Sequence, residues 1–263
     1  MKVLESTHIL TKIVEAKKQR LERTKMRVPE EVVKHFALKA PEIPSFKEAL
    51  QNSKPVRVIA EVKKASPSKG VLTKDFSVAQ LVGAYTESGA VAISVATEED
   101  FFQGSLAWIG ETRDKSPLPV LRKDYIFDAY QIFETRNAKA SAIQLIVAML
   151  EPDELQYFLS LAKVVGLDAL VEVHNETELR EALDAGAEII GVNNRNLRTL
   201  EVDVQTSHRL AGLIPENCFF VVESGIRHPA EIDALQAAGA DAFLIGEALV
   251  VHADPAFMLL SLM

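Results

Sequence analysis

Short apolar runs recur along the chain from residue 56 onward, and stretches with helical spacing separate them. The runs cover residues 56–63, 90–97, 119–124, 141–148, 168–174, 188–194, 219–224 and 241–248. The intervening stretches, such as "FSVAQLVGAYTE" and "ETELREALD", place apolar residues three or four positions apart. Strands that alternate with amphipathic helices at a spacing of roughly 20 to 35 residues are typical of a parallel α/β repeat.

Helix boundaries are marked by local signals. Asn175 and Glu178 fit a capping box at the start of one helix, and Pro229 suits the first turn of another. Gly186 suits the end of a helix, where the backbone often turns left-handed. These signals place helices between the apolar runs and support their interpretation as strands.

Eight strand–helix units in one chain of this length predict a (β/α)8 TIM barrel, an α/β fold that forms a single domain. An open, doubly wound sheet is the alternative, but no G-x-G-x-x-G turn follows the first strand. Residues 1–45 lie outside the repeat and contain a helical stretch at 8–23. We therefore expect an N-terminal helical extension over 1–45, packed on a barrel that covers 46–263.

Composition fits a globular enzyme. The chain has 263 residues, of which 48% are hydrophobic and 25% are charged. No apolar run reaches the roughly 18 residues that cross a bilayer, and the spaced apolar residues at the N-terminus do not resemble a signal peptide. Cys218 is the only cysteine, so no internal disulfide is possible. These features predict a cytoplasmic protein.

The net charge of −8 argues against nucleic acid and anionic membranes as partners. A local basic cluster in the extension comprises Lys17, Lys18, Arg20 and Arg23. We interpret this cluster as a solvated helix face.

Polar residues gather where the predicted strands end. These ends carry Glu61, Lys63, Lys123, Glu172, Asn193, Glu223 and Ser224. In a barrel, active sites are built at the carboxyl ends of the strands. Strand alternation lets all five charged groups face inward, each two residues beyond an apolar neighbour. One charged strand end can be a structural ion pair, but five that converge indicate an active site, because such crowding shifts pKa values toward the range that acid–base catalysis needs.

A phosphate site is predicted at the loops after the last two strands, which begin "ESGIRH" and "IGEALV". Gly225 and Gly246 would let backbone N–H groups approach an anion, and a short helix starting near Glu247 would add its positive end. Ser66 and Ser68, in the loop after the first strand, would face the same site.

No metal site is expected. His174 lies close to Glu172 in the sequence, but no other histidine or cysteine is placed to join it. We interpret His174 as a solvated loop residue.

The motif "VIAEVKKASPSKG" closely resembles the signature of indole-3-glycerol phosphate synthase. The similarity continues in the family's order through "FFQGS", "PVLRKDY", "YQIFETR", "ALVEVHNETEL", "IIGVNNRNLRTLEVD", "VVESGI" and "FLIGEALV". It covers residues 45 to 263. The resemblance implies conversion of 1-(2-carboxyphenylamino)-1-deoxyribulose 5-phosphate to indole-3-glycerol phosphate without a cofactor, and it implies a phosphorylated small molecule as the partner.

The resemblance also implies roles for the strand-end residues. Lys123 would be the acid that protonates the ketone oxygen, and Glu172 the base or the stabiliser of a cationic intermediate. Lys63 would pair with the substrate carboxylate and assist dehydration. The other residues that the resemblance marks as catalytic are Glu61, Asn193 and Ser224. Those that it marks as substrate-binding are Ser66, Phe102, Tyr125, Arg195, Glu223, Gly225, Gly246 and Glu247. Phe102 and Tyr125 would form the wall around the aromatic ring. Because a phosphate repels a carboxylate, the Glu247 side chain would point away from the phosphate.

A few positions depart from the family pattern. Gln144 and Ala96 stand where leucine is common, Ala129 where proline is common, and Glu247 where many relatives have serine or threonine. We expect the Gln144 face of its strand to line the barrel interior, with Lys123 and Glu172 as the nearest partners for the amide.

Two alternatives stay open at this stage. One is a lyase that forms a Schiff base through Lys63 or Lys123, and the other is a barrel that serves only as an assembly partner. The chain has no second enzyme domain after the last repeat, so a fused isomerase is not expected. We expect a monomer or a weak homodimer.

Overall fold

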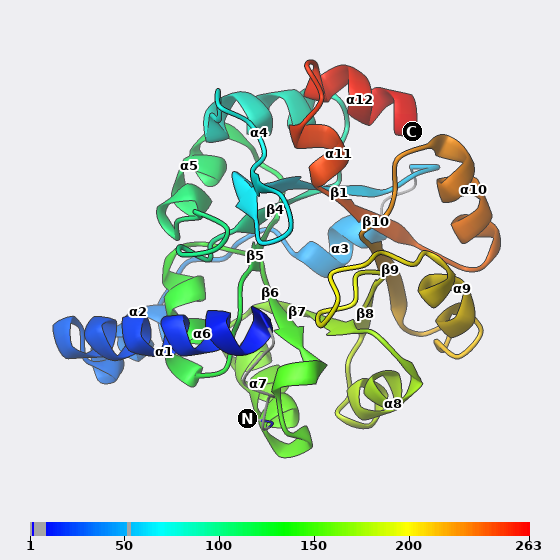
Figure 1. Ribbon diagram of the computed structural model, residues 1–263. Coiled ribbons are helices and arrows are strands. Elements are labelled where there is room, and N and C mark those ends of the chain that lie inside the picture. Colours follow the sequence, from blue (N-terminus) through cyan, green and yellow to red (C-terminus); the bar gives the residue numbers. More distant parts are fainter. Residues whose placement is uncertain (1, 3–8, 52–53) are drawn as a thin grey trace.

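Parallel strands that close into a barrel form the centre of the protein (Figure 1). The computed structural model describes residue 2, residues 9–51 and residues 54–263. Within these residues the barrel has eight strands, in the order β1-β10-β9-β8-β7-β6-β5-β4. They are β1 (Val58–Val62), β4 (Ala92–Ala96), β5 (Val120–Lys123), β6 (Ala142–Ile146), β7 (Asp168–Val173), β8 (Ile189–Asn193), β9 (Phe219–Glu223) and β10 (Ala242–Ile245). Each lies inside a predicted run, so the barrel is confirmed and the open sheet is wrong.

Helices follow the strands and surround the barrel (Figure 1). They are α4 (Val78–Glu87), α5 (Ala107–Lys115), α6 (Ala129–Asn137), α7 (Pro152–Val164), α8 (Glu176–Asp184), α9 (Gln205–Ala211), α10 (Pro229–Ala237), α11 (Glu247–Val250) and α12 (Pro255–Leu262), with a 3-10 turn η1 (Val147–Met149). Pro229 begins α10 as predicted, and half of the predicted capping box is present: the Asn175 side chain accepts a hydrogen bond from the Glu178 N–H, whereas the Glu178 carboxylate accepts from the His174 N–H. None of the helices in the described part of the chain is long and apolar enough to span a bilayer.

A small hairpin lies in the loop after β1, and the sequence did not predict it. It consists of β2 (Ala65–Ser66) and β3 (Gly70–Val71), which pair antiparallel. Strands of two residues are too short to carry a periodic signal, so hydrophobic patterning cannot find them. The hairpin fixes the position of Ser66 at the end of β1.

The barrel interior is layered. An apolar layer contains one residue from each strand: Ile59, Ala92, Leu121, Ala142, Leu170, Ile189, Val221 and Leu244. Two residues further along each strand lies a second set, which we call the polar layer: Glu61, Ser94, Lys123, Gln144, Glu172, Gly191, Glu223 and Gly246. Because side chains in a strand alternate between faces, both sets point into the barrel. The polar layer is therefore the floor of the barrel's carboxyl end.

The segment before β1 is helical, as predicted. It contains α1 (Ile9–Arg27), α2 (Glu30–Leu38) and α3 (Phe46–Leu50). Of the stretch expected to be helical, His8 lies outside the described residues. Helix α2 packs against α6, and α1 lies across the carboxyl end of the barrel (Figure 1). Phe46 and Leu50 of α3 join the apolar layer and close the other end.

Lys17 on α1 is buried, so the prediction of a solvated basic face is wrong at this position. Its ammonium group lies 2.7 Å from a carboxylate oxygen of Asp124 and 2.9 Å from one of Glu99. Asp124 also pairs with Arg122 at 2.9 Å, and the Lys17 and Arg122 cations together help lower the pKa of Asp124 to about 2 against the opposing effect of burial. Arg20 pairs with Asp100, whereas Lys18 stays exposed. This buried network ties α1 to the end of β5.

Replacing Lys17 with methionine should destabilise the protein strongly. The Lys17→Met variant leaves the Asp124 carboxylate buried with one cation fewer, and breaking a buried pair typically costs about 3–5 kcal/mol. Urea unfolding followed by circular dichroism measures the change. Lys18→Met on the exposed side of the same helix is the matched control and should shift stability by less than about 0.5 kcal/mol. Equal stabilities of the two variants would contradict the structural role of Lys17.

Candidate active site

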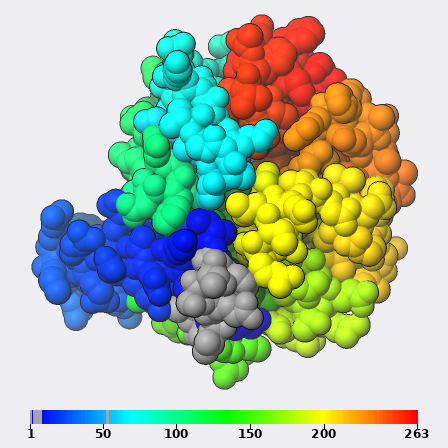
Figure 2. Space-filling model, in the orientation of Figure 1, coloured from blue at the N-terminus to red at the C-terminus, as the bar shows by residue number. Residues whose placement is uncertain are grey.

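A pocket opens at the carboxyl ends of the strands, above the polar layer. The β1 loop, the loop after β8 and helix α1 converge over its mouth, where cyan, yellow and blue segments meet in Figure 2. Every residue that the sequence assigned to catalysis or substrate binding lines this pocket: Glu61, Lys63, Ser66, Phe102, Lys123, Tyr125, Glu172, Asn193, Arg195, Glu223, Ser224, Gly225, Gly246 and Glu247. The structure thus brings the whole predicted set together.

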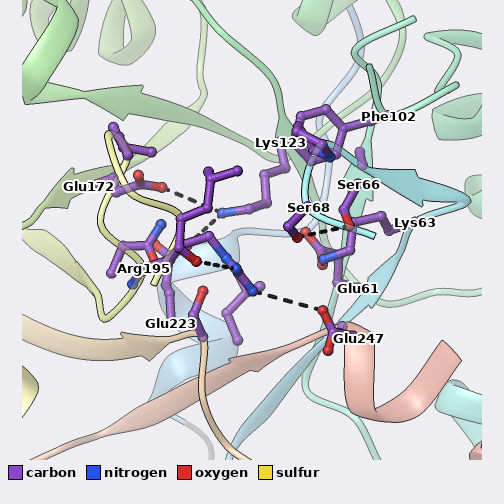
Figure 3. A pocket seen from close by; sticks show the side chains of 18 of the residues that line it. Glu61, Lys63, Ser66, Ser68, Phe102, Lys123, Glu172, Arg195, Glu223 and Glu247 are labelled. Atoms are coloured by element: carbon purple, nitrogen blue, oxygen red, sulfur yellow. Dashed lines mark hydrogen bonds and ion pairs between the residues drawn. The ribbon is translucent and has the colours of Figure 1, made fainter. Parts of the chain in front are cut away.

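Lys123 lies at the centre of the polar layer (Figure 3). Its Nζ is 2.5 Å from Oε2 of Glu223 and 3.6 Å from Oε2 of Glu172. Burial alone would lower the pKa of Lys123, but the surrounding carboxylates, led by Glu223, outweigh burial and raise that pKa above its ordinary value. Lys123 is therefore a charged ammonium group at neutral pH.

The two carboxyl groups that share Lys123 titrate very differently. For Glu172, burial opposes ionisation, but the Lys123 ammonium and His174 outweigh it and lower the pKa to about 2. For Glu223, burial and the nearby Glu172 charge prevail and raise the pKa to about 7. Two carboxyl groups beside one cation cannot both ionise easily, so their pKa values separate. The pocket therefore holds one carboxyl group that is ionised at neutral pH while Lys123 is charged, and one whose pKa is raised toward neutrality.

Glycines on neighbouring strands make room for the buried glutamates. A Cβ at Gly246 would lie 1.9 Å from Oε2 of Glu61, and a Cβ at Gly191 would lie 2.3 Å from Oε1 of Glu223. Glu61 in turn forms an ion pair with Lys63, whose side chain is largely buried. The polar layer can hold these side chains only because two of its positions have no side chain.

An aromatic wall stands beside Lys123. The rings of Phe102 and Tyr125 lie 6.1 Å apart between centroids, at an angle of 46°. The buried carboxylate of Glu98 accepts hydrogen bonds from the backbone N–H groups of Phe101 at 2.7 Å and Phe102 at 2.9 Å, which fixes the loop. Sequence reasoning missed Glu98, because a carboxylate that binds its own following backbone shows no distinctive spacing.

Ser224 and Gly225 form the turn after β9 with left-handed backbone angles. The φ of Ser224 is 66° and that of Gly225 is 91°. A residue with a Cβ rarely adopts such an angle, and this kind of backbone strain clusters at functional sites. The turn brings the Gly225 backbone to the pocket wall.

Glu247 lies in the wall of the pocket, and its carboxylate is surrounded by positive groups. Its carboxylate lies 2.7 Å from Lys69, 3.8 Å from Arg195 and 3.9 Å from Arg227 (Figure 3 draws its ion pair with Arg195). We call these residues the cation cluster: Lys69, Arg195 and Arg227. That the Glu247 side chain points away from a bound phosphate stays a prediction, which considers repulsion alone and not the cations that attract both groups.

His174 is not a solvated loop residue, which corrects a second expectation. Only 12% of its side chain is exposed. Its Nε2 lies 3.1 Å from Oε1 of Glu172, and its Nδ1 lies 2.9 Å from Oε2 of Glu178. Both carboxylates raise the pKa of His174 to about 10, against the opposing effect of burial.

The N-terminal helix contributes to the pocket, which the sequence did not reveal. Ile9, Leu10 and Ile13 of α1 line its wall, as do Leu197 and Leu200 from the loop after β8. Helical spacing marks an apolar face on α1, but it does not say which surface that face covers.

No group of three or more His, Cys, Asp or Glu side chains that could hold a metal ion is present among the described residues.

Gln144 faces the barrel interior and donates a hydrogen bond from Nε2 to Oε2 of Glu172, one of its two expected partners. Its Oε1 is buried without a protein partner, as are Oγ of Ser94 and Oε1 of Glu223, which belong to the same polar layer. An ionised carboxylate can only accept, so the amide must turn its nitrogen to Glu172 and leave its oxygen unpaired.

The chain is similar over almost its whole length to known proteins of one family. The family profile named "Indole-3-glycerol phosphate synthase" matches residues 10–262. Indole-3-glycerol phosphate synthase of Dehalococcoides mccartyi is 47% identical over 249 residues, covering 94% of this chain and 96% of that protein. The protein of the same name from Endomicrobium trichonymphae is 48% identical and covers 92% and 94%. That from Lachnoclostridium phytofermentans is 41% identical and covers 97% and 98%.

Similar solved structures are distant in sequence and support the fold alone. A 3-hexulose-6-phosphate synthase aligns with a TM-score of 0.60 at 16% identity, over 79% of this chain and 98% of that chain. Thiamine phosphate pyrophosphorylase from Pyrococcus furiosus aligns with a TM-score of 0.57 at 15% identity, over 79% and 93%.

Gln144→Leu should keep most of kcat and change mainly KM. The amide does not titrate in the accessible range, so it can orient Glu172 without transferring a proton. Steady-state kinetics on the carboxyphenylamino substrate measures both constants. Gln156→Leu, on an exposed face of α7, is the matched control and should change neither. A loss of kcat as large as that expected below for Lys123→Ala would instead make Gln144 part of the catalytic machinery.

Proposed function

The chain belongs to the indole-3-glycerol phosphate synthase family, and on that premise we propose how its pocket residues divide the reaction among them. The enzyme is a carboxy-lyase of tryptophan biosynthesis that closes the indole ring of a phosphorylated small molecule. The family assignment resolves the alternatives of a Schiff-base lyase and a non-catalytic barrel. The ring carbon that bears the carboxyl group attacks the ketone, carbon dioxide leaves, and water leaves last.

Lys123 is the acid of the ring closure. As the carbon–carbon bond forms, the ketone oxygen gains negative charge and must take a proton to become a hydroxyl group. The observation that carries this assignment is the position of the Lys123 ammonium: it is charged, at the floor of the pocket, and beside the aromatic wall. A general acid must be protonated at working pH, and the raised pKa of Lys123 ensures that it is.

Glu172 is coupled to that proton transfer. The Lys123 charge is the largest of the effects that lower the pKa of Glu172. Once Lys123 gives up its proton, this charge disappears, and Glu172 becomes a stronger base at the moment when a cationic intermediate has formed beside it. Glu172 therefore stabilises the cation first and gains the capacity to accept a proton afterwards.

Lys63 completes the chemistry on the β1 side. Its ammonium group pairs with Glu61 and faces the same pocket, where it can bind the substrate carboxylate and later protonate the departing hydroxyl group. Arg195 offers a second positive group to the carboxylate, and Asn193 and Ser224 complete the polar shell. Phe102 and Tyr125 hold the aromatic ring.

The phosphate binds at the turns after β9 and β10. The backbone at Gly225 and Gly246 lines this side of the pocket, and the cation cluster lies next to it. Ser66 adds a hydroxyl group from the β1 loop. Backbone N–H groups and cations together form the kind of site that phosphate prefers.

The domain boundary, the oligomeric state and the cellular location are the remaining parts of the proposal. We place the boundary between the extension and the barrel at residues 45 and 46, because Phe46 already belongs to the barrel's apolar layer. The monomer or weak homodimer expected from the sequence stays a prediction. A phosphorylated substrate supports a cytoplasmic location, since charged phosphate esters do not cross membranes unaided.

Lys123→Ala should lower kcat by roughly a hundredfold or more, the usual scale of general acid catalysis. Substrate binding should survive because the turns after β9 and β10 are unchanged. Indole fluorescence measures turnover, and calorimetry measures binding. Lys115→Ala, which removes an exposed lysine from α5, is the control and should leave both unchanged. Near-normal kcat in Lys123→Ala would move the acid role to Lys63.

Glu247→Ser should bind the substrate as tightly as the native enzyme or a few-fold more tightly, because the change frees Lys69 and Arg195 for the phosphate. The inhibition constant of inorganic phosphate and the KM of the substrate both report the effect. Glu216→Ser removes the same charge from the loop before β9 and should change neither constant. A large loss of affinity in Glu247→Ser would show that Glu247 orients the cation cluster for binding.

A further inference from the structure

His174, at the end of β7, connects two carboxylates that belong to different layers of the protein. Glu172 projects into the pocket from β7, and Glu178 lies on α8 outside the barrel. Nδ1 of His174 makes a hydrogen bond of 2.9 Å with Oε2 of Glu178, and Nε2 lies at an ion-pair distance of 3.1 Å from Oε1 of Glu172 without the alignment of a hydrogen bond. A neutral imidazole has a proton on only one nitrogen, so a ring with a carboxylate at both nitrogens is best matched as the doubly protonated imidazolium.

Glu178 is itself fixed by the cap of α8. Its backbone N–H donates to the Asn175 side chain at 3.0 Å, and its carboxylate accepts from the Asn175 amide at 2.7 Å and from the His174 backbone N–H at 2.8 Å. The hydrogen bonds around the N-cap of this helix therefore also fix the carboxylate that orients the histidine ring. The ring has little freedom to rotate away from Glu172.

Both oxygens of Glu172 therefore lie next to polar groups, Oε2 in a hydrogen bond and Oε1 at an ion-pair distance. Oε1 faces the imidazole of His174, while Oε2 accepts from the Gln144 amide and lies 3.6 Å from the Lys123 ammonium. Of the two cations beside Glu172, Lys123 loses its charge in the proposed ring closure. His174 does not touch the pocket interior and keeps its charge throughout that step.

We propose that His174 is a positioning residue that holds Glu172 ionised and correctly oriented while Lys123 is without its proton. The proposal rests on the proposed function in one respect, the participation of Glu172 in the reaction. It assigns no proton transfer to His174. Its effect is to keep a negative charge beside the cationic intermediate after the first cation has been neutralised.

Charges on the surrounding elements support this assignment. The groups around His174 and its partner Glu172 are Glu178 on α8, Lys123 on β5, Tyr125 after β5, Gln144 on β6, Asn193 on β8 and Glu223 on β9. The two groups in direct contact with the ring are carboxylates, and they raise the pKa of His174 to about 10. The imidazolium is thus the form present at neutral pH.

Two substitutions of His174 test the proposal by kinetics. His174→Phe keeps the ring volume but removes both donors, and kcat should fall about tenfold to a hundredfold, as expected when a reacting group loses its orientation. KM should change by less than about twofold, because substrate binding does not involve His174. His174→Gln keeps one neutral donor and should recover part of kcat.

The pH profile separates positioning from mere structural support. Without the cation, the pKa of Glu172 rises, so the acid limb of kcat should move to higher pH in His174→Phe across the range in which the protein stays folded. A structural defect would lower the yield of folded protein without moving this limb. His35→Gln on the exposed face of α2 is the control and should leave kinetics and profile unchanged.

Glu172→Gln separates failure of the inference from failure of the proposed function. If Glu172→Gln is inactive while His174→Phe has normal kcat and an unshifted acid limb, the inference about His174 is overturned and the proposed function stands. If Glu172→Gln retains native activity, the proposed role of Glu172 fails. In the Glu172→Gln background, adding His174→Phe should cause no further loss of kcat.

A measurement on the native enzyme covers the case in which the His174 variants do not fold. Nitrogen-15 NMR of histidine-labelled protein reports the protonation of each imidazole ring. The His174 signals should be those of an imidazolium at pH values where exposed histidines are neutral, whose ordinary pKa is about 6.5. A neutral His174 ring at pH 8 would overturn the proposal.

Discussion

The structure depends on burying one ammonium group among several carboxylates at the level where the apolar interior ends. Lys123 is the cation that Glu172 and Glu223 share. An unpaired charge at this depth would destabilise the fold severely, and mutual pairing removes most of that penalty. The polar layer is possible because Gly191 and Gly246 leave space for the glutamates beside them. The eight positions of the polar layer thus determine both the charges of the active site and the packing of the barrel interior.

Strand periodicity was enough to predict the barrel, because every barrel strand lies inside an apolar run, with helical patterns between the runs. The alternation of side chains along a strand also predicted which strand-end residues share the pocket. The face to which a side chain points depends only on its position within its own strand, so it can be read from the local sequence. What it could not predict is where the flanking segments dock. The apolar face of α1 carries no information about its partner, so the contribution of Ile9 and Leu10 to the pocket emerges only in three dimensions.

Charges were misjudged wherever the partner is remote or belongs to a different element. Lys17 looked solvated because Asp124, its buried partner, lies 107 residues away. His174 looked like a loop residue because the Glu178 carboxylate reaches it only once α8 has formed. A sequence shows the type of each charge, but pairing is a property of the folded chain.

The link between α1 and β5 has a consequence for how the chain is made in the cell. Helix α1 leaves the ribosome before the barrel strands, and Glu99 and Asp124, which hold Lys17, follow Lys17 by 82 and 107 residues. Barrel closure waits longer still, because Val58 on β1 pairs with Phe243 on β10. Until those segments are synthesised, the apolar face of α1 and one edge of β1 are therefore without their partners, and exposed surfaces of this kind promote aggregation.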